Sequence, residues 1–201
     1  VDVSAATTRG VVVMNTPFGN SITTAEHAIA MMFSLARQIP VANASTQAGK
    51  WEKSRFMGVE VYGKTLGLIG CGNIGSIVAN RALGLKMKVV AYDPYLSPAR
   101  AADLGVEKVE LDELFSRANF ITLHTPLTEA TRSIINKDAI AAMRDDVRII
   151  NCARGGLVVE EDLKAGIESG KVAGAAIDVF TEEPAKENTL FGVEGVIATP
   201  H

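Results

Sequence analysis

The sequence predicts an α/β fold in which a doubly wound parallel sheet carries helices on both faces. Short apolar runs alternate with amphipathic stretches of helix length from Thr65 onward, which is the order of repeated βαβ units. The apolar runs are hydrophobic almost throughout, as expected of strands that are covered on both sides. A chain of 201 residues, with 47% hydrophobic and 21% charged residues, can bury one such domain with some sequence to spare.

The expected strands and helices alternate along most of the chain. The first strand covers 65–69 and leads through a glycine-rich turn into a helix over 74–83. The remaining strands are predicted at 87–92, 120–123, 147–150, 173–177 and 196–198, and the remaining helices at 98–104, 137–143 and 161–169. These elements suffice for one complete sheet domain.

The first sixty residues do not follow this alternation. Residues 10–15 read as a strand that Thr16 and Pro17 close. Residues 44–63 carry Trp51, several charges and several glycines without clear periodicity, which indicates a surface connection leading into the first sheet strand.

A helix is predicted between these two segments, over residues 23–39. Thr23 and Glu26 have the spacing of a capping box, and the apolar stripe that follows stops at Pro40. Apolar side chains also spread around the opposite side of this helix. Such a helix needs burial from two directions, so it either bridges two domains or subunits or lies in the core, and the sequence leaves both interpretations open.

Composition excludes several classes of function. A formal net charge of −3 gives no basic surface for a nucleic acid. The chain has neither a signal peptide at its start nor a run of eighteen apolar residues, so we expect a soluble, cytoplasmic protein without membrane contact. The two cysteines, Cys71 and Cys152, have no partner at metal-ligand spacing, which predicts neither a disulfide framework nor a bound metal.

The most informative motif is the glycine turn between the first strand and its helix. Gly70 permits the tight turn, Gly72 lets the backbone approach a pyrophosphate, and Gly75 lets the helix pack on the strand. Asp93 ends the next apolar run, where a carboxylate accepts hydrogen bonds from ribose hydroxyls and repels a 2′-phosphate. The turn alone could be loop punctuation, but its flanking elements and Asp93 favour a dinucleotide, with NAD preferred over NADP.

Three further polar clusters follow predicted strands, at 124–126, 151–156 and 178–184. This is the edge of an open parallel sheet where ligands bind. Arg154 offers a planar fork of donors for a carboxylate, although it could instead pair with a neighbouring acid; Glu183 alone could be a solvated turn acid, and His201 alone would carry no meaning. Together they provide an arginine for the carboxylate of a 2-hydroxy acid, a histidine for its hydroxyl proton, and a glutamate that stabilises the protonated histidine.

Several blocks of the sequence occur together in one enzyme family. They are Met14-Asn15-Thr16-Pro17, Gly19-Asn20-Ser21, Ala25-Glu26, Leu35-Ala36-Arg37-Gln38-Ile39-Pro40, Gly67-Leu68-Ile69-Gly70-Cys71-Gly72-Asn73-Ile74-Gly75, Leu123-His124-Thr125-Pro126-Leu127, Asn151-Cys152-Ala153-Arg154-Gly155-Gly156 and Ala176-Ile177-Asp178-Val179-Phe180. In these blocks the chain resembles the D-isomer-specific 2-hydroxyacid dehydrogenase family over nearly its whole length. The resemblance implies a Rossmann-type domain over 21–201, including the helix at 23–39. It also implies that 1–20 are a remnant strand and connection of a second, substrate-binding domain largely absent from this chain.

The resemblance also implies a role for individual residues. Arg154 would bind the substrate carboxylate, Glu183 would be the acid partner, and His201 would be the general acid/base. The residues implied in NAD binding are Gly70, Gly72, Asn73, Ile74 and Gly75 around the pyrophosphate, Asp93 at the ribose, Thr125 with the backbone of Cys152, Ala153 and Arg154 on the nicotinamide side, and Asp178 at the carboxamide. His27 and His124 inherit no proton-transfer role; His27 reads as a structural helix residue and His124 as a residue that lines the cleft.

The function implied by the resemblance is NAD-dependent oxidation of a D-2-hydroxy acid. The Asn-Thr-Pro block and the Ala-Arg-Gln-Ile-Pro helix end favour 3-phosphoglycerate, which would become 3-phosphohydroxypyruvate. A glyoxylate, hydroxypyruvate or D-lactate reductase, and a non-catalytic NAD-sensing module that assembles on partners as corepressors do, stay open as alternatives. The helix at 23–39 corresponds to a subunit contact of the family, which implies a homo-oligomer of at least two chains. Because the second domain helps to close and dry the site, we expect this chain to hold NAD well and to turn over poorly.

Overall fold

The computed structural model describes residues 1–16 and 18–201, and its centre is a seven-stranded sheet. The strands are β1 (Thr65–Ile69), β2 (Lys88–Tyr92), β3 (Glu107–Lys108), β4 (Phe120–Leu123), β5 (Val147–Asn151), β6 (Val172–Ile177) and β7 (Val196–Ala198). They lie in the order β3-β2-β1-β4-β5-β6-β7, and each neighbouring pair is parallel. The predicted α/β class and doubly wound sheet are confirmed, and each strand predicted from residue 65 onward lies within one residue of its expected bounds.

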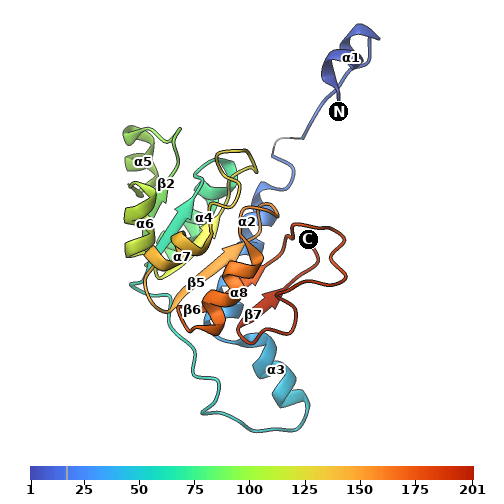
Figure 1. Cartoon of the computed structure of the whole chain (residues 1–201). Helices are drawn as coiled ribbons and strands as arrows, with labels where there is room; N and C mark the ends of the chain where they lie inside the picture. Colours follow the sequence, from blue (N-terminus) through green and yellow to red (C-terminus); the bar gives the residue numbers. More distant parts are fainter. Residues whose placement is uncertain (17) are drawn as a thin grey trace.

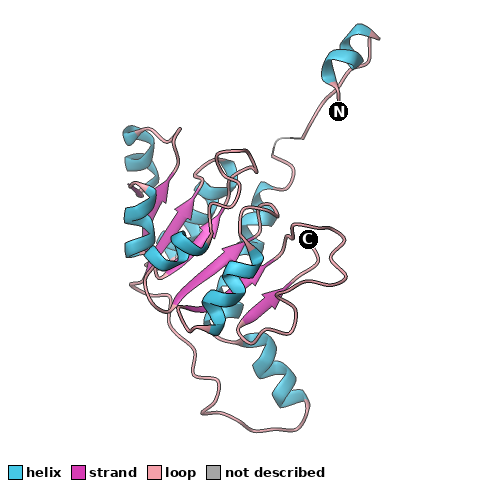
Figure 2. Cartoon of the chain, viewed as in Figure 1, coloured by secondary structure: helices cyan, strands magenta, loops and turns pink. Residues whose placement is uncertain are grey.

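Helices cover both faces of this sheet (Figures 1 and 2). They are α1 (Val3–Thr8), α2 (Ser21–Ala36), α3 (Ile39–Gln47), α4 (Asn73–Gly84), α5 (Pro98–Leu104), α6 (Leu111–Arg117), α7 (Lys137–Ala142) and α8 (Glu160–Glu168). Side chains of α2, α4 and α5 share one hydrophobic cluster with one face of the sheet, and side chains of α6, α7 and α8 share a second cluster with the other face. The strands therefore lie between two apolar layers, which is why they are hydrophobic almost throughout.

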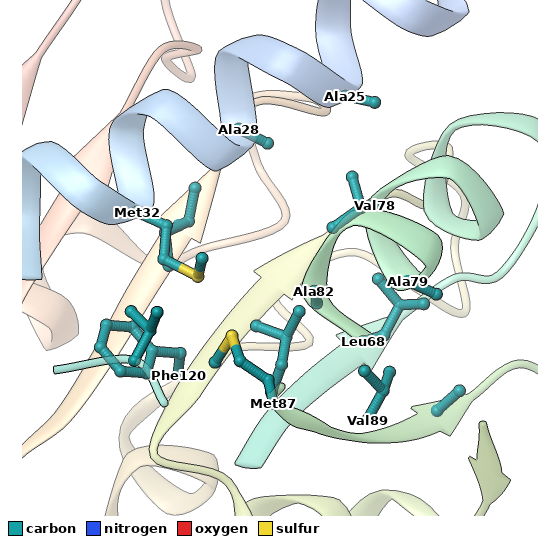
Figure 3. Packing of buried hydrophobic residues seen from close by; sticks show 14 of the residues in the cluster. Ala25, Ala28, Met32, Leu68, Val78, Ala79, Ala82, Met87, Val89 and Phe120 are labelled. Carbon is teal, nitrogen blue, oxygen red and sulfur yellow. The ribbon is translucent and has the colours of Figure 1, made fainter. Parts of the chain in front are cut away.

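The core beneath α2 and α4 fixes how these two helices sit on the sheet. Figure 3 shows Met32 of α2 directed toward Phe120 of β4, and Val78 of α4 between α2 and Leu68 of β1. All four side chains are buried, and each large apolar side chain taken out of water contributes about 1.5–3 kcal/mol. This burial anchors the start of α4, and with it the glycine turn, against the end of β1.

The helix predicted at 23–39 begins earlier in the structure. α2 starts at Ser21 after Asn20 as its N-cap, so Thr23 lies inside the first turn and the predicted capping box with Glu26 is wrong. Both Thr23 and Glu26 are exposed. A residue inside the first turn already has helical backbone angles, so its side chain cannot take the place of an N-cap.

The same helix also ends earlier than predicted. α2 stops at Ala36, and Gln38, with a φ of 54°, redirects the chain into α3. Pro40 lies in the first turn of α3 rather than ending a helix. A proline is tolerated there because the N–H groups of a first turn have no partner inside the helix.

Packing of α2 decides between the two interpretations of its apolar surface. α2 packs against α4 and against β5, β6 and β7, so most of its apolar side chains belong to the core of this domain. Ile22 at its start and Ile39 just after its end are 57% and 50% exposed. Core burial therefore explains the sheet-facing side, and a domain or subunit contact at this helix stays a prediction.

The strand predicted at 10–15 is wrong. Residues 11–16 are exposed and have no regular structure, because no described strand lies beside them to share backbone hydrogen bonds. The preceding residues form α1, which we did not predict; its N-cap Asp2 accepts a hydrogen bond from the Ala5 N–H at 2.9 Å. α1 buries no residue and lies apart from the sheet in Figure 1. Pro17, expected to close the strand, falls outside the described residues.

The strand order places a crevice at one edge of the sheet. β1 lies between β2 and β4, so the chain winds first to one side of β1 and then to the other. Connections that leave β1 and β4 in opposite directions open a crevice at their carboxyl ends. The loops after β1, β2, β4, β5, β6 and β7 meet at this same edge because all the strands are parallel.

Among the helices of residues 1–16 and 18–201, none combines the length and the apolar character that a membrane span requires.

Candidate active site

Three glycines of the turn after β1 have three different surroundings. Gly70 has a φ of +90°, and a Cβ there would lie 2.5 Å from the His124 carbonyl oxygen. A Cβ on Gly75 would lie 2.2 Å from the Gly70 carbonyl oxygen, so only glycine lets α4 approach β1 this closely. A Cβ on Gly72 would meet nothing within 4 Å. The open space beside Gly72 is where a ligand can approach the backbone.

The first turn of α4 faces this open space. Its N-cap is Gly72 and its first residues are Asn73 and Ile74, so no N-cap side chain covers the free N–H groups. Such N–H groups, together with the positive end of the helix dipole, favour an anion such as a pyrophosphate.

Asp93 lies beside the turn, directly after β2. Its carboxylate accepts the Cys71 N–H at 2.7 Å and the Tyr95 N–H at 2.8 Å. One acceptor site on each oxygen is thereby used, and the remaining lone pairs face outward for further donors. Two backbone N–H groups thus fix the Asp93 carboxylate next to the glycine turn, and its contact with a ribose stays a prediction.

A cleft of about 770 Å³ continues from the turn along the strand ends. Among the residues predicted to bind a cofactor or substrate, it is lined by Ile74, Thr125, Cys152, Ala153, Arg154, Asp178 and His201. Residues of α2 and its N-cap, including Asn20, Thr24 and His27, form part of its wall. A larger groove of about 1050 Å³ lies at the opposite, amino-terminal ends of β5, β6 and β7 and contains none of the predicted site residues. The residues present fit a dinucleotide, because Ile74, in the first turn of α4 next to the open space at Gly72, lines this cleft.

Arg154 is held by its own loop and is exposed. The Asn151 side chain donates to the Arg154 carbonyl oxygen at 3.0 Å and accepts the Ala153 N–H at 3.1 Å, which fixes the backbone after β5. The Arg154 guanidinium donates to the Ala153 carbonyl oxygen at 2.6 Å. Within the described residues it forms no ion pair, which argues against the alternative of a structural arginine paired with an acid.

Glu183 and His201 are in direct contact. His201 Nδ1 lies 2.7 Å from Glu183 Oε2, while Glu183 Oε1 accepts the Phe180 N–H at 3.0 Å. These hydrogen bonds, with the charges of His201 and Arg154 as smaller effects, lower the pKa of Glu183 below its ordinary value. An ionised Glu183 therefore stands beside a histidine whose side chain is 51% exposed and accessible from the cleft.

A close approach of two loops brings Arg154 near this pair. A Cβ on Gly155 would lie 1.8 Å from the Phe180 carbonyl oxygen, so the loop after β5 touches the loop that carries Glu183. Only a glycine permits this contact. Neighbouring loops, rather than one motif, therefore assemble the three predicted catalytic side chains.

Cys152, predicted to meet the cofactor through its backbone, has a thiol of low reactivity. It is buried, and burial, with the nearby charge of Asp178 as a second cause, raises the pKa of its thiol to about 12. The thiol stays protonated at neutral pH and is a poor nucleophile. The expected contact of a ligand with the backbone of residues 152–154 stays a prediction.

His124 is enclosed at the end of β4. Its Nε2 lies 2.9 Å from Thr122 Oγ1, while its Nδ1 is buried without a hydrogen-bond partner among the described residues. Burial lowers the pKa of His124 to about 4, so the ring is neutral at pH 7. His124 lines the cleft, as predicted, and its lack of a proton-transfer role stays a prediction.

Sequence reasoning missed the surroundings of Asp178. His27 Nε2 lies 3.3 Å from Asp178 Oδ1, and Thr199, a residue without a predicted role, donates to the same oxygen at 2.5 Å. His27, Cys152 and Asp178 place possible metal-ligand atoms within 4.8 Å of one another, a grouping that sequence spacing did not reveal. His27 Nε2 lies 3.3 Å from both Asp178 Oδ1 and Thr199 Oγ1, and Thr199 donates to Asp178, so contacts among side chains already hold this group together. In the sequence, the one indication of these contacts was weak: Thr199 stands directly before Pro200 and the predicted site residue His201.

Comparison with known proteins identifies the family of this chain. Residues 29–201 match the profile of the D-isomer specific 2-hydroxyacid dehydrogenase NAD binding domain. The D-3-phosphoglycerate dehydrogenase of Synechocystis sp. is 52% identical over 201 residues, which are 100% of this chain and 36% of that protein. The chain thus spans little more than a third of the length of this relative.

Solved structures agree with this placement. The TT0316 protein of Thermus thermophilus superposes with a TM-score of 0.92 at 34% identity, over 100% of this chain and 64% of that chain. D-lactate dehydrogenase of Aquifex aeolicus, solved with NAD and lactic acid, superposes with a TM-score of 0.87 at 31% identity, over 100% of this chain and 65% of that chain. Residues 29–201 of this chain correspond to the NAD-binding domain of the family.

Proposed function

The chain belongs to the D-isomer-specific 2-hydroxyacid dehydrogenase family, and we propose that it is the NAD-binding part of an enzyme that oxidises 3-phosphoglycerate to 3-phosphohydroxypyruvate. This reaction would be the first step of serine biosynthesis. The observation that carries the proposal is the pairing of His201 with Glu183 at 2.7 Å, beside an exposed Arg154, at the end of a cleft that begins at the glycine turn.

The proposed reaction assigns one task to each side chain. Arg154 binds the substrate carboxylate through its planar fork of N–H donors. His201 takes the proton of the C2 hydroxyl, and Glu183 holds the ring through Nδ1 and stabilises its positive charge. NAD, when bound, accepts the hydride that leaves C2. The carbon is thereby oxidised from an alcohol to a ketone, and one proton stays on His201 until solvent removes it.

Cofactor contacts are part of the same proposal. Gly70, Gly72, Asn73, Ile74 and Gly75 would surround the pyrophosphate, and Asp93 would accept the ribose hydroxyls. Thr125, the backbone of residues 152–154 and Asp178 would meet the nicotinamide side. Support comes from the open space at Gly72 and from the cleft, which is lined by Ile74, Thr125, residues 152–154 and Asp178.

The choice of substrate rests on the relatives. The 52% identical Synechocystis protein carries the name D-3-phosphoglycerate dehydrogenase, while the 31% identical structure that holds lactic acid is a D-lactate dehydrogenase. Both reactions need the same arginine, histidine and carboxylate, so these residues cannot choose between them. Sequence identity favours the phosphorylated substrate.

A substrate panel tests the proposal. The chain, and the longest natural protein that contains it, would be assayed with NAD and 3-phosphoglycerate, D-lactate or D-glycerate, following NADH absorbance. We expect 3-phosphoglycerate to give the highest kcat/KM. Arg154→Ala should lower that value by about a hundredfold, since an arginine that binds the reacting carboxylate acts on the transition state.

Two controls make the panel decisive. NADH binding to Arg154→Ala should stay within about twofold of the wild type, because the cofactor contacts of Arg154 use its backbone. A higher kcat/KM for D-lactate would assign another member of the family. NADH binding without turnover of any hydroxy acid by the longer protein would favour a non-catalytic NAD-sensing module.

We further propose that the chain acts in the cytoplasm as a homo-oligomer, with residues 1–20 belonging to a second domain and 21–201 to the NAD-binding domain. Large apolar side chains are exposed along α3 and the connection after it: Val41, Trp51, Met57 and Tyr62 are 54%, 86%, 79% and 70% exposed. An apolar surface of this kind is typical of a protein interface. Sedimentation equilibrium should give at least a dimer, and Trp51→Glu should shift the population toward monomer.

A further inference from the structure

Asp178 is bound on one of its two carboxylate oxygens. Thr199 Oγ1 donates to Asp178 Oδ1 at 2.5 Å, and His27 Nε2 lies 3.3 Å from that same oxygen. His27 Nε2 is also 3.3 Å from Thr199 Oγ1, so the three side chains form a closed group. Within the described residues, no hydrogen bond reaches the second oxygen, Oδ2. A carboxylate held in this way cannot rotate freely about its last bond.

The three side chains come from separate parts of the fold. His27 lies on α2, Asp178 follows β6, and Thr199 follows β7. The backbone is fixed as well, because the Asp178 N–H donates to the Asn151 carbonyl at 2.9 Å and the Thr199 N–H donates to the Ile177 carbonyl at 3.0 Å. The Asp178 side chain is 13% exposed, and all three residues line the cleft that starts at the glycine turn. A nearly buried carboxylate with one free oxygen is therefore presented to the ligand.

We propose that His27 and Thr199 are positioning residues, which hold Asp178 so that its Oδ2 accepts an N–H of the nicotinamide carboxamide. This inference rests on the proposed function, since it needs the nicotinamide end of NAD in this cleft. An ionised carboxylate is only an acceptor, so it selects an amide N–H and repels a carboxylate at the same ring position. The chain should therefore distinguish NAD from nicotinic acid adenine dinucleotide, in which a carboxylate replaces the amide.

Calorimetry with two ligands tests the positioning role. NADH contains nicotinamide, whereas ADP-ribose has the same adenosine and pyrophosphate without it. His27→Leu and Thr199→Val should each weaken NADH binding by about tenfold and leave ADP-ribose binding within about twofold. His27→Gln keeps an N–H at nearly the reach of Nε2 and should restore most of the NADH affinity. Glu26→Gln, on the same helix turn but exposed, is the matched control and should change neither.

A second comparison examines the amide itself. The wild-type chain should bind NAD at least about tenfold more tightly than nicotinic acid adenine dinucleotide, and Asp178→Asn should narrow that ratio. Thermal melting of each variant separates loss of folding from loss of binding. Three results would overturn the inference alone. The first is that His27→Leu weakens the binding of NADH and of ADP-ribose equally, and the second is that NADH affinity is unchanged in both His27→Leu and Thr199→Val. The third is equal affinity of the wild-type chain for NAD and nicotinic acid adenine dinucleotide. Failure of the wild-type chain to bind either NADH or ADP-ribose would overturn the proposed function and the inference with it.

Discussion

The glycine turn after β1 and the cluster of Arg154, Glu183 and His201 lie at the same edge of the sheet but are built differently. The turn is fixed by backbone contacts that no other residue type allows, as at Gly75. The cluster consists of side chains open to solvent, and those of His201 and Glu183 are 51% and 35% exposed. Close backbone contacts thus define the turn, whereas the side chains of the cluster are accessible to water, which the proposed reaction would have to exclude.

Titratable groups show the same contrast. His124, beneath the turn, has a lowered pKa because burial disfavours its charged form. Glu183, in the cluster, has a lowered pKa because hydrogen bonds from His201 and from the Phe180 N–H favour its charged form. One group is thus kept neutral and the other kept charged. The difference teaches that packing controls the ionisation of the side chain next to the turn, whereas polar contacts control it in the cluster.

The largest expected effect comes from adding one methyl group to the turn. Gly75→Ala should reduce the free energy of unfolding by about 3 kcal/mol, because its Cβ would lie 2.2 Å from a backbone oxygen that only a shift of α4 or β1 can relieve. Gly72→Ala is the matched control: its Cβ meets nothing, so stability should change by no more than about 0.5 kcal/mol while NADH affinity falls. Urea denaturation and calorimetry measure the two quantities. Equal losses of stability would mean that the turn is less rigid than the contacts imply.

The second-largest expected effect is a loss of stability in acid that arises from His124. The unfolded chain takes up a proton near the ordinary histidine pKa of 6.5, whereas folded His124 stays neutral until about pH 4. The free energy of unfolding should therefore fall as pH decreases between these values, by about 3 kcal/mol at most from this residue. His124→Gln keeps a polar contact for Thr122 and lacks the titration, so its stability should depend less on pH over this window. Parallel pH profiles for the two proteins would contradict a neutral buried ring.

A smaller effect is expected on the preference of the chain for NADH over NADPH. Asp93→Asn should weaken NADH binding by about tenfold and narrow the preference over NADPH, because the substitution removes the charge that repels a 2′-phosphate. Calorimetry with both cofactors measures the ratio. Equal affinities of the wild-type chain for NADH and NADPH would refute the assignment of Asp93 to the ribose.

The smallest effect is expected at the exposed pair. His201→Ala should raise the pKa of Glu183 toward its ordinary value, because the hydrogen bond from His201 is the largest cause of its lowering. The contribution of this contact to stability is complete above the ordinary carboxyl pKa and is lost as pH falls through the lowered one. Carbon-detected NMR titration of the Glu183 carboxyl gives both midpoints. An unchanged midpoint in the variant would show that the contact is too weakly formed in solution to matter.

Sequence periodicity predicted the buried part of the fold well and the exposed part poorly. Strands such as β1 and β4 were placed at their observed bounds, because burial on both faces leaves a continuous apolar run. β3 and α6 were not predicted, since two and seven residues carry too little periodicity. The errors at both ends of α2 came from reading Thr23 and Pro40 by residue type, although each lies in a first helical turn rather than at a boundary.

The candidate site was predictable to the extent that its residues follow strands. Arg154, Asp178 and His201 follow β5, β6 and β7, and the structure brings them to one cleft as expected for a parallel sheet. The contact of His27 with Asp178 was not predictable, because it joins residues 151 positions apart through the packing of α2 on the sheet. Long-range pairing of this kind leaves no periodic signal in a single sequence.

The edges of the sheet carry a consequence for how copies of this chain can meet. β3 has two residues and β7 has three, so neither edge presents a long row of unpaired backbone groups. Strand addition between molecules, the route by which open sheets grow into larger assemblies, is disfavoured at such short edges. The proposed homo-oligomer would therefore form through side-chain surfaces, where contacts can be specific and can stop at a defined number of copies.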